Sequence, residues 1–272
     1  MRKYFFVFVL SFFGAGLLSA ENNVHLSELR LQKEVIGNFD ILKHYLGNYI
    51  KYAKENPEDY EAQWQVSQLS YYLWRYYGFK DKKQLGIYTN LGYKYAKKAK
   101  KIVPKGQDAV YYEVMNLTAI GILKGPLYAI NVVKVIKSEL ENMLKLYPAA
   151  NYKQGVWLRL LGRVYIFAPP FPVGFGDIDK GITIELKATE KFPNEPMNFI
   201  YLAIGYAIKG ELDKSIFSLQ LAEKLLINSD KSLYKNMKQM VMVNHLMNLV
   251  QQYKEKGLER IPKNIIKNKV AY

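Results

Sequence analysis

Two arginines, Arg159 and Arg163, are the residues of this sequence whose type and spacing come nearest to a chemical site. On a helix, side chains four positions apart share a face, with about 5–6 Å between their Cβ atoms. Two guanidinium groups placed in this way can bind one carboxylate through paired hydrogen bonds. The same arginines could instead pair with glutamates of an adjacent helix or face water. The spacing is therefore compatible with anion binding, and all three interpretations stay open.

Eight other residues are candidates for binding because they fall on comparable helix faces or in an unusual loop. They are Gln68, Tyr72, Arg75, Tyr112, Met115, Asn116, Phe171 and Phe175. A surface that carries Arg, Gln and Tyr side chains can hold a peptide tail or a small acidic solute. The competing interpretation is structural. Tyrosines are often half-buried with the hydroxyl at the surface, and the two phenylalanines could pack against a neighbouring unit of the fold.

Catalytic and metal-binding patterns are missing from the sequence. It contains no cysteine, which excludes disulfides and thiol chemistry. The three histidines, His25, His44 and His245, are scattered, and no two have the spacing of ligands on one helix. Gly174 and Gly176 lack the rest of a phosphate-binding fingerprint. We therefore expect no enzyme activity, no metal ion and no cofactor.

The first 20 residues have the features of a secretory signal peptide. Arg2 and Lys3 precede an uncharged, mostly apolar stretch over 4–18, and the small residue Ala20 follows it. The stretch is short for a bilayer span, which needs roughly 20 apolar residues. We expect cleavage near Ala20 and a soluble protein in the periplasm or cell envelope. Retention of the segment as a membrane anchor is the alternative.

The chain is strongly basic, with 39 Lys and Arg against 24 Asp and Glu and a formal net charge of +15. Six lysines fall on or directly after one predicted helix: Lys94, Lys97, Lys98, Lys100, Lys101 and Lys105. Such a surface can make peripheral contact with an anionic membrane, or it can be an ordinary solvated helix face. Nucleic acid is not an expected partner of an exported protein.

Four prolines, Pro57, Pro104, Pro148 and Pro193, recur at spacings of 47, 44 and 45 residues. Each ends a run of helical character, and a period of this length is typical of stacked helical hairpins. One hairpin alone cannot bury the apolar stripes of both its helices, whereas stacked neighbours can. The sequence therefore predicts an all-α fold, a right-handed α-solenoid of about five hairpins with a C-terminal capping helix.

The expected helices cover 24–37 and 39–55, 60–77 and 82–103, 108–123 and 126–147, 152–167 and 177–192, 196–209 and 212–227, and 230–256. Ser229 is expected to cap the last of them, which would cover the end of the array. The chain then divides into a signal peptide at 1–20, one repeat domain at 21–256 and a basic, loosely ordered tail at 257–272. A proline-rich loop at 168–176 interrupts one hairpin.

Two hairpins match the tetratricopeptide (TPR) pattern, in which an aromatic residue, Leu-Gly and a second aromatic lie on the first helix. One of them provides Trp157, Leu161, Gly162 and Tyr165, followed by Ala188 and Pro193. Small residues let helix backbones approach closely, and aromatic side chains fill the gaps beside them. In a TPR array the first helices line a concave groove, so that Arg159 and Arg163 would face it.

The chain resembles the T-component family of periplasmic TPR proteins that are associated with TRAP transporters. The resemblance covers most of the chain after the leader. It is carried by Trp64-x-x-Ser67, Ala96 and Ala99 before Pro104, Gly121 and Gly125, and Leu161-Gly162-Arg163-x-Tyr165 followed by the proline-rich loop and Gly176-Asp177. It implies an α-helical solenoid that works beside a solute-binding protein and its membrane permease. Glu21 stands where members of the family carry a lipidated cysteine.

The expected function is that of an exported, non-catalytic binding or scaffold protein. Its partner would be a protein, such as a periplasmic solute-binding protein, or a small acidic solute held in the concave groove. A homo-oligomer stays open. The role that the resemblance implies is that of an accessory to TRAP-type solute uptake. The alternative is a scaffold for envelope assembly that docks through basic convex surfaces.

Overall fold

The computed structural model describes residues 31, 35–36, 38–78, 81–148 and 151–270. The predicted signal peptide at 1–20 and most of the predicted helix at 24–37 lie outside these residues. The described helices are α3 (Phe39–Glu55), α4 (Tyr60–Tyr77), α5 (Lys82–Ile102), α6 (Gln107–Lys124), α7 (Pro126–Leu146), the 3₁₀ helix η3 (Tyr152–Gln154), α8 (Val156–Phe167), α9 (Ile178–Lys191), α10 (Pro196–Lys209), α11 (Leu212–Ile227), α12 (Tyr234–Glu255) and α13 (Lys263–Val270).

Local sequence signals set most of the helix ends. The side chains of Asn38, Asp59, Asp81 and Asp177 accept hydrogen bonds from N–H groups in the first turns of α3, α4, α5 and α9. Gly210 ends α10 in a left-handed conformation, with a φ of +100°, that other residues adopt only with strain. For this reason α3, α4, α10 and α11 have the bounds that the sequence predicts.

Two helices begin later than predicted. The helix expected from residue 152 is first the short η3, and α8 starts only at Val156, after Lys153, Gln154 and Gly155 have all taken positive φ values. The helix expected from residue 230 starts at Tyr234. Ser229 does not cap it, because its hydroxyl donates to the carbonyl of Leu226 at the end of α11.

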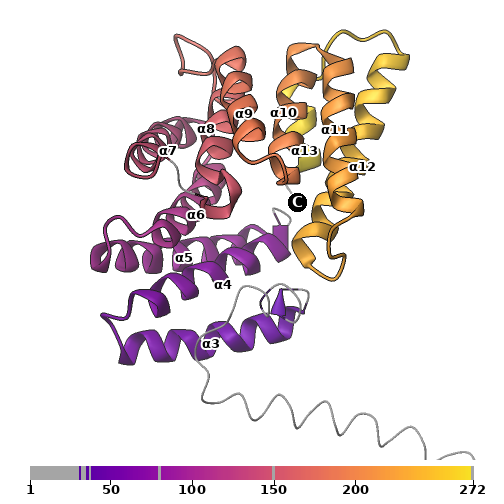
Figure 1. Cartoon of the computed structure of the whole chain (residues 1–272). Helices are drawn as coiled ribbons and strands as arrows, with labels where there is room; N and C mark the ends of the chain where they lie inside the picture. Colours follow the sequence, from indigo (N-terminus) through magenta and orange to yellow (C-terminus); the bar gives the residue numbers. More distant parts are fainter. Residues whose placement is uncertain (1–30, 32–34, 37, 79–80, 149–150, 271–272) are drawn as a thin grey trace, which may run out of the picture.

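The helices form consecutive hairpins, as predicted, with α4 against α5, α6 against α7, α8 against α9 and α10 against α11. Figure 1 shows them arranged in an arc around a central space, with α3–α5 at one end, α6–α8 in the middle and α9–α12 at the other end. The prediction of an all-α array of hairpins is confirmed. Within the described residues, no helix combines the length and the apolar character that a bilayer span requires.

Hydrogen bonds join residues that are about one repeat apart in sequence. The Tyr152 hydroxyl donates to Asp108 Oδ1 at 2.7 Å, across 44 residues. The Trp157 indole donates to Gln107 Oε1 at 3.0 Å, across 50 residues. Because equivalent positions of neighbouring hairpins are in contact, the proline period of the sequence is also the stacking period of the fold.

The C-terminal segment differs from the loosely ordered tail that the sequence predicts. Residues 263–270 form α13, and Ile261 and Ile266 are fully buried in the cluster made by α10, α11 and α12. The backbone N–H of Ile261 donates to the carbonyl of Ala207 at 3.0 Å. These contacts fix the segment on the ends of the preceding helices, at least as far as residue 266.

The two ends of the arc also approach each other. Tyr234, the first residue of α12, packs against the hydrophobic cluster that α3, α4, α5 and α6 build. In Figure 1 the start of α12 lies near the ends of α3 and α4 that face the central space. The arc is therefore closed on itself at this point.

Candidate functional site

Three of the predicted binding residues, Gln68, Tyr112 and Asn116, belong to the core and do not line a groove. The Gln68 amide donates to the Tyr112 hydroxyl at 2.6 Å, and both side chains are buried. The Asn116 amide receives the Trp74 indole N–H at 3.1 Å and donates to the Ser67 hydroxyl at 3.0 Å. These groups satisfy one another between α4 and α6, where a buried polar group without a partner would be costly. The structure therefore places these three predicted residues inside the fold and not on the predicted groove.

Arg159 is buried as well, and it has a structural task. Its guanidinium donates to the carbonyls of Lys153 at 3.2 Å and Gln154 at 3.1 Å, and to Asn198 Oδ1 on α10. Those two carbonyls belong to the left-handed turn that delays the start of α8. The guanidinium therefore holds the turn and ties it to the next hairpin. The structure does not present Arg159 and Arg163 together for the predicted clamp on one carboxylate, because only Arg163 is accessible.

Arg163 is half-buried and lies between aromatic rings of two helices. Its guanidinium donates to the Tyr201 hydroxyl at 3.1 Å and lies 5.3 Å from the centre of that ring and 5.9 Å from the ring of Phe167. Cation–π contacts of this kind hold a guanidinium in place without neutralising it. Arg163 therefore keeps a full positive charge at this surface.

A fully buried carboxyl, that of Glu185 on α9, lies behind the two arginines. Neither of its oxygens has a hydrogen-bond partner. Burial raises the pKa of Glu185 well above its usual value, against the opposing effect of Arg159 and Arg163. Within the described residues, Glu185 forms no ion pair with either arginine.

Arg75 is exposed at the end of α4, on the same side of the arc. It donates to the Tyr71 hydroxyl at 2.6 Å, and its guanidinium lies 5.4 Å from that ring. The phenol of Tyr71, and to a smaller extent those of Tyr111 and Tyr201, raise the pKa of Arg75 above its ordinary value. The ring centre of Tyr71 lies 6.5 Å from that of Tyr111 on α6, so Arg75 lies beside the aromatic cluster that α4 and α6 share.

Lys153 brings a third cation to this region. Its ammonium lies 5.2 Å from the ring centres of Tyr111 and Tyr152 and 5.7 Å from that of Tyr112. The residue has a φ of +44° in the left-handed turn that Arg159 holds. Few residues other than glycine adopt this backbone conformation without strain. The turn therefore places the Lys153 ammonium beside the tyrosines at an energetic cost.

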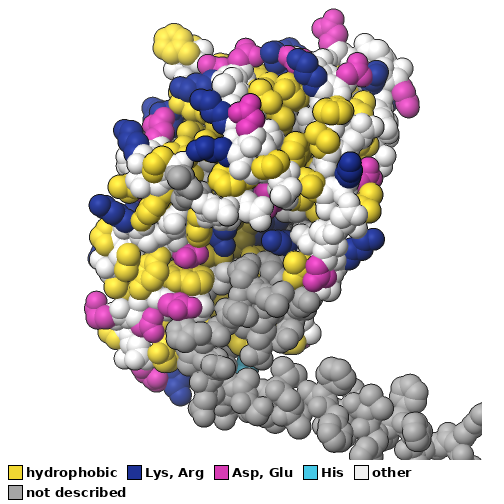
Figure 2. Space-filling view, in the orientation of Figure 1, with side chains coloured by type: hydrophobic (Ala, Val, Ile, Leu, Met, Phe, Trp, Pro, Cys, Tyr) yellow, Lys and Arg dark blue, Asp and Glu magenta, His cyan; other side chains and the backbone are white. Residues whose placement is uncertain are grey.

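We call the surface made by Tyr71, Tyr72, Arg75, Tyr111, Lys153, Arg163 and Tyr201 the inner site. These residues come from α4, α6, the turn before α8, α8 itself and α10, which border the central space in Figure 1. In the part of the chain that the structure describes, none of its three cations forms an ion pair. Figure 2 shows that this face of the molecule is hollowed at its centre, with Lys or Arg side chains inside the hollow.

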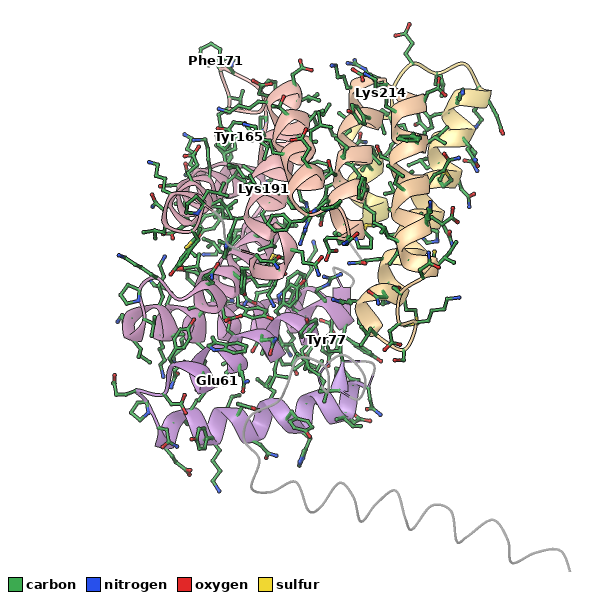
Figure 3. All side chains as sticks on the ribbon, in the orientation of Figure 1. Glu61, Tyr77, Tyr165, Phe171, Lys191 and Lys214 are labelled. Carbon is green, nitrogen blue, oxygen red and sulfur yellow. The ribbon has the colours of Figure 1, made fainter. Side chains whose placement is uncertain are left out.

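The remaining predicted residues divide between the inner site, the core and the proline-rich loop. Tyr72 is half-buried at the inner site, and Met115 is half-buried against the first hydrophobic cluster. Phe175 packs edge-on against Tyr165, with 5.7 Å between the ring centres. Phe171 is 87% exposed, and Figure 3 shows it at the tip of the loop, projecting away from the helices. The structure thus brings neither phenylalanine to the inner site.

Sequence reasoning missed four residues that matter here: Tyr111, Lys153, Glu185 and Tyr201. A signal for Glu185 is present, since it falls on the stripe of Gly181, Ile182 and Ala188 that faces the core. Lys153 gives no comparable signal, because its position depends on the turn that replaces the predicted first turn of α8. Within the described ranges, no three His, Asp or Glu side chains gather as metal ligands would.

A crystal structure of a thermophilic TPR protein from Thermus thermophilus is similar to this chain, with a TM-score of 0.54. The similarity covers 74% of this chain and 91% of that chain, at 16% sequence identity. No protein-family model and no curated protein matches the sequence. At this level of identity the similarity concerns the fold alone, and it shows that the chain is a TPR-like all-α solenoid.

Proposed function

We propose that this chain is a non-catalytic, TPR-like binding protein that holds an acidic segment of a partner protein, or a small acidic solute, at its inner site. The observation that carries the proposal is the charge pattern. Arg75, Lys153 and Arg163 border the central space, and their described partners are phenols and aromatic rings in place of carboxylates. Cations held in this way still favour an anionic ligand.

The chemistry of the inner site suits binding better than catalysis. Guanidinium, ammonium and phenol groups all donate hydrogen bonds to a carboxylate. Burial raises the pKa of Tyr111 well above its usual value, so that its phenol is a poor nucleophile or base at neutral pH. The tyrosine faces would contact the apolar parts of a ligand while the cations bind its charge.

As the finer role, we infer an accessory to TRAP-type solute uptake, acting in the periplasm after cleavage of the leader near Ala20. The support for it is the TPR-like fold together with the sequence resemblance described above, which includes Leu161-Gly162-Arg163-x-Tyr165. The acidic partner would then be an extended acidic segment of the periplasmic solute-binding protein, or the acidic solute that this protein delivers.

The experiment compares two triple variants that lower the charge equally. Arg75, Lys153 and Arg163 are changed to Gln in the first, and the exposed Lys94, Lys97 and Lys101 of α5 are changed to Gln in the second. The probe is a fluorescein-labelled octaglutamate peptide, followed by anisotropy. We expect at least about tenfold weaker binding in the first variant and less than about twofold in the second. Equal weakening in both would leave only a general effect of charge and contradict the inner site.

The uptake role is tested separately by pull-down from intact envelopes. A solute-binding protein should be recovered with the natural chain and lost with the inner-site triple variant. Recovery of the same protein with both the natural chain and the inner-site triple variant would contradict the role of the inner site in uptake.

Docking through the basic convex surface is the second candidate function. The row of lysines on α5 is less free than its sequence suggests, because Lys100 forms ion pairs with Glu113 at 2.9 Å and Glu139 at 2.8 Å. Lys98 is half-buried against Tyr95. If the α5 variant lost octaglutamate binding and the inner-site variant kept it, this second function would replace the first.

A further inference from the structure

The proline-rich loop between α8 and α9 is fixed at its base by backbone hydrogen bonds. The N–H of Gly176 donates to the carbonyl of Pro169 at 2.7 Å, and the N–H of Asp177 donates to that of Tyr165 at 2.9 Å. The N–H of Gly174 donates to the carbonyl of Pro170 at 3.0 Å. A loop closed in this way presents its tip in a defined position instead of as a loose segment.

The loop divides its apolar side chains between two environments. Phe175 points inward and packs on Tyr165. Phe171 and Val173 point outward at the tip, with 87% and 60% of their surface exposed, and Pro170 and Pro172 are exposed beside them. The inward phenylalanine is explained by packing. The outward pair has no contact in the described chain that would explain an aromatic and a branched apolar residue at this point.

Three lysines surround the base of the loop. The ammonium of Lys180 lies 4.4 Å from the ring centre of Tyr165, and that of Lys137 lies 5.6 Å from the ring centre of Phe175. The ammonium of Lys263, at the start of α13, donates to the carbonyl of Ala168 at 3.4 Å. Lysine side chains of α7, α9 and α13 therefore lie around the base of the apolar tip.

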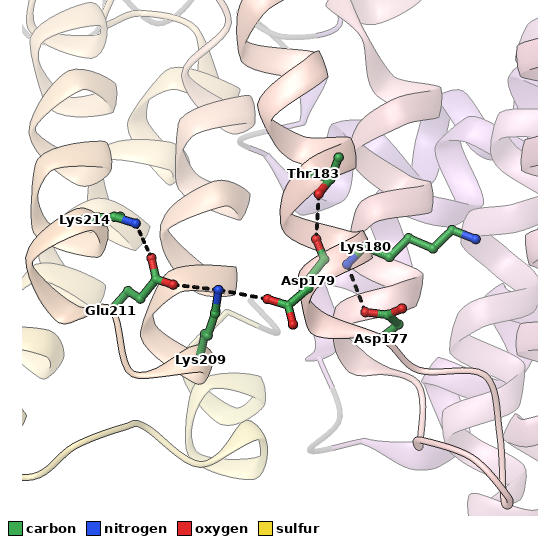
Figure 4. A network of polar contacts seen from close by, with 7 residues as sticks. All are labelled: Asp177, Asp179, Lys180, Thr183, Lys209, Glu211 and Lys214. Carbon is green, nitrogen blue, oxygen red and sulfur yellow. Dashed lines mark hydrogen bonds and ion pairs between the residues drawn. The ribbon is translucent and has the colours of Figure 1, made fainter.

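The acidic groups near the loop take part in a helix cap and in ion pairs. Asp177 accepts the backbone N–H of Lys180 as the cap of α9, and Asp179 forms an ion pair with Lys209 at 2.8 Å. Figure 4 shows both, with the Asp179–Lys209–Glu211–Lys214 chain leading away toward α11. Glu141 pairs with Lys137 at 2.7 Å. Asp179 and Glu141 are thus held in ion pairs and Asp177 caps α9, while the tip itself is uncharged.

We propose that this loop docks the protein onto an anionic bilayer surface, with Phe171 and Val173 inserted among the headgroups and the exposed Lys180 facing the lipid phosphates. Exposed aromatic and aliphatic tips above lysines are the features by which proteins bind a membrane interface without spanning it. A protein partner fits less well, because a specific interface buries about 1,200 Å² or more and two side chains supply far less. The proposal does not depend on the function of the inner site.

The test uses the natural absence of cysteine from the full chain. Val173→Cys is labelled with the environment-sensitive fluorophore NBD, and Phe217→Cys serves as the matched control, since Phe217 is an exposed apolar residue (61%) on α11. Vesicles of phosphatidylcholine with 30% phosphatidylglycerol, or of phosphatidylcholine alone, are then titrated into each protein. Because the label reports its own surroundings, the reading is independent of any vesicle contact made by residues 1–20.

We expect a several-fold rise in emission at position 173 with the anionic vesicles, a weaker rise with the neutral ones and none at position 217. Adding Phe171→Ser to the labelled Val173→Cys chain should raise the vesicle concentration needed for half the signal by about tenfold. Phe171 has few contacts to lose, so this variant keeps its fold. Unchanged emission at 173, or an equal rise at 173 and 217, would overturn the proposal.

Discussion

The carboxyl group of Glu185 on α9 fills the space beside the Cα atom of Gly162 on α8. A Cβ atom at position 162 would overlap Oε1 of Glu185. The glycine of the TPR pattern therefore does more than let two backbones approach, since it makes room for a buried acid. Two helices, a glycine and a carboxyl form one packing unit behind the inner site.

Gly162→Ala should lower the free energy of unfolding by about 2 kcal/mol, because the added methyl group must displace a fully buried side chain. Gly47→Ala is the matched control. Gly47 lies in the interior of α3, and a Cβ there would meet no atom within 4 Å. That variant should gain about 0.5–1 kcal/mol from helix propensity. Urea denaturation measures both, and the prediction fails if the two changes have the same sign.

Glu185→Gln should change the dependence of stability on pH. The raised pKa of Glu185 means that the folded state binds a proton more tightly than the unfolded chain does. Stability is therefore unaffected by this group below the unfolded pKa of roughly 4.3. It falls as the pH rises from there to the folded pKa. We expect the variant to lose this part of the decline and to be the more stable protein at neutral pH. Parallel curves for the two proteins from pH 4 to 8 would contradict this.

Arg159 and Arg163 should differ sharply when each is replaced by alanine. Removing Arg159 takes one donor from the carbonyls of Lys153 and Gln154 and from Asn198 Oδ1, and should cost about 3 kcal/mol of unfolding free energy. Removing the half-buried Arg163 should cost less than about 1 kcal/mol. Octaglutamate binding should instead weaken in Arg163→Ala. Similar losses of stability in both variants would mean that the two arginines share one role.

Lys153→Gly and Lys153→Ala separate the charge of the lysine from its backbone conformation. Both remove the ammonium and should weaken octaglutamate binding to the same extent. The glycine variant relieves the left-handed strain and should be about 1 kcal/mol more stable than the alanine variant. Thermal denaturation and anisotropy on the same samples check the two effects. If the more stable glycine variant bound octaglutamate more tightly than the alanine variant, the role of the ammonium would be contradicted.

Ile266→Ala tests whether the C-terminal segment belongs to the fold. Ile266 is fully buried, so the variant should lose about 2–4 kcal/mol of unfolding free energy. Leu258→Ala, at a residue that is 45% exposed, is the control and should lose less than about 1 kcal/mol. If Ile266→Ala lost as little unfolding free energy as Leu258→Ala, the result would support the loosely ordered tail that the sequence predicts.

The sequence predicts the hairpin array well, because each helix end depends on a few neighbouring residues. Prolines cannot continue a helix and short polar side chains cap one, so the limits of α3, α4, α10 and α11 follow from local chemistry. The period of the prolines adds the order of stacking. None of this requires knowledge of contacts that are distant in sequence.

The inner site is less predictable, because it depends on such distant contacts. The spacing of Arg159 and Arg163 indicates a shared helix face, but the burial of one of them depends on Asn198 and on a left-handed turn. Gln68 and Asn116 look available on a helical wheel and are satisfied by Tyr112, Ser67 and Trp74 instead. Nothing in the spacing alone distinguishes a polar residue that binds a ligand from one that joins two helices.

The contact of Tyr234 with the first helices limits how far the two ends of the arc can move apart. In an open solenoid, the helices can move apart and widen the inner surface to admit a large ligand. Here the start of α12 packs against the opposite end of the arc, so that any widening of the inner surface must first break this contact. An extended chain end or a small molecule can reach the inner site without breaking this contact. A folded domain can reach it only after the contact between Tyr234 and the first helices has been broken.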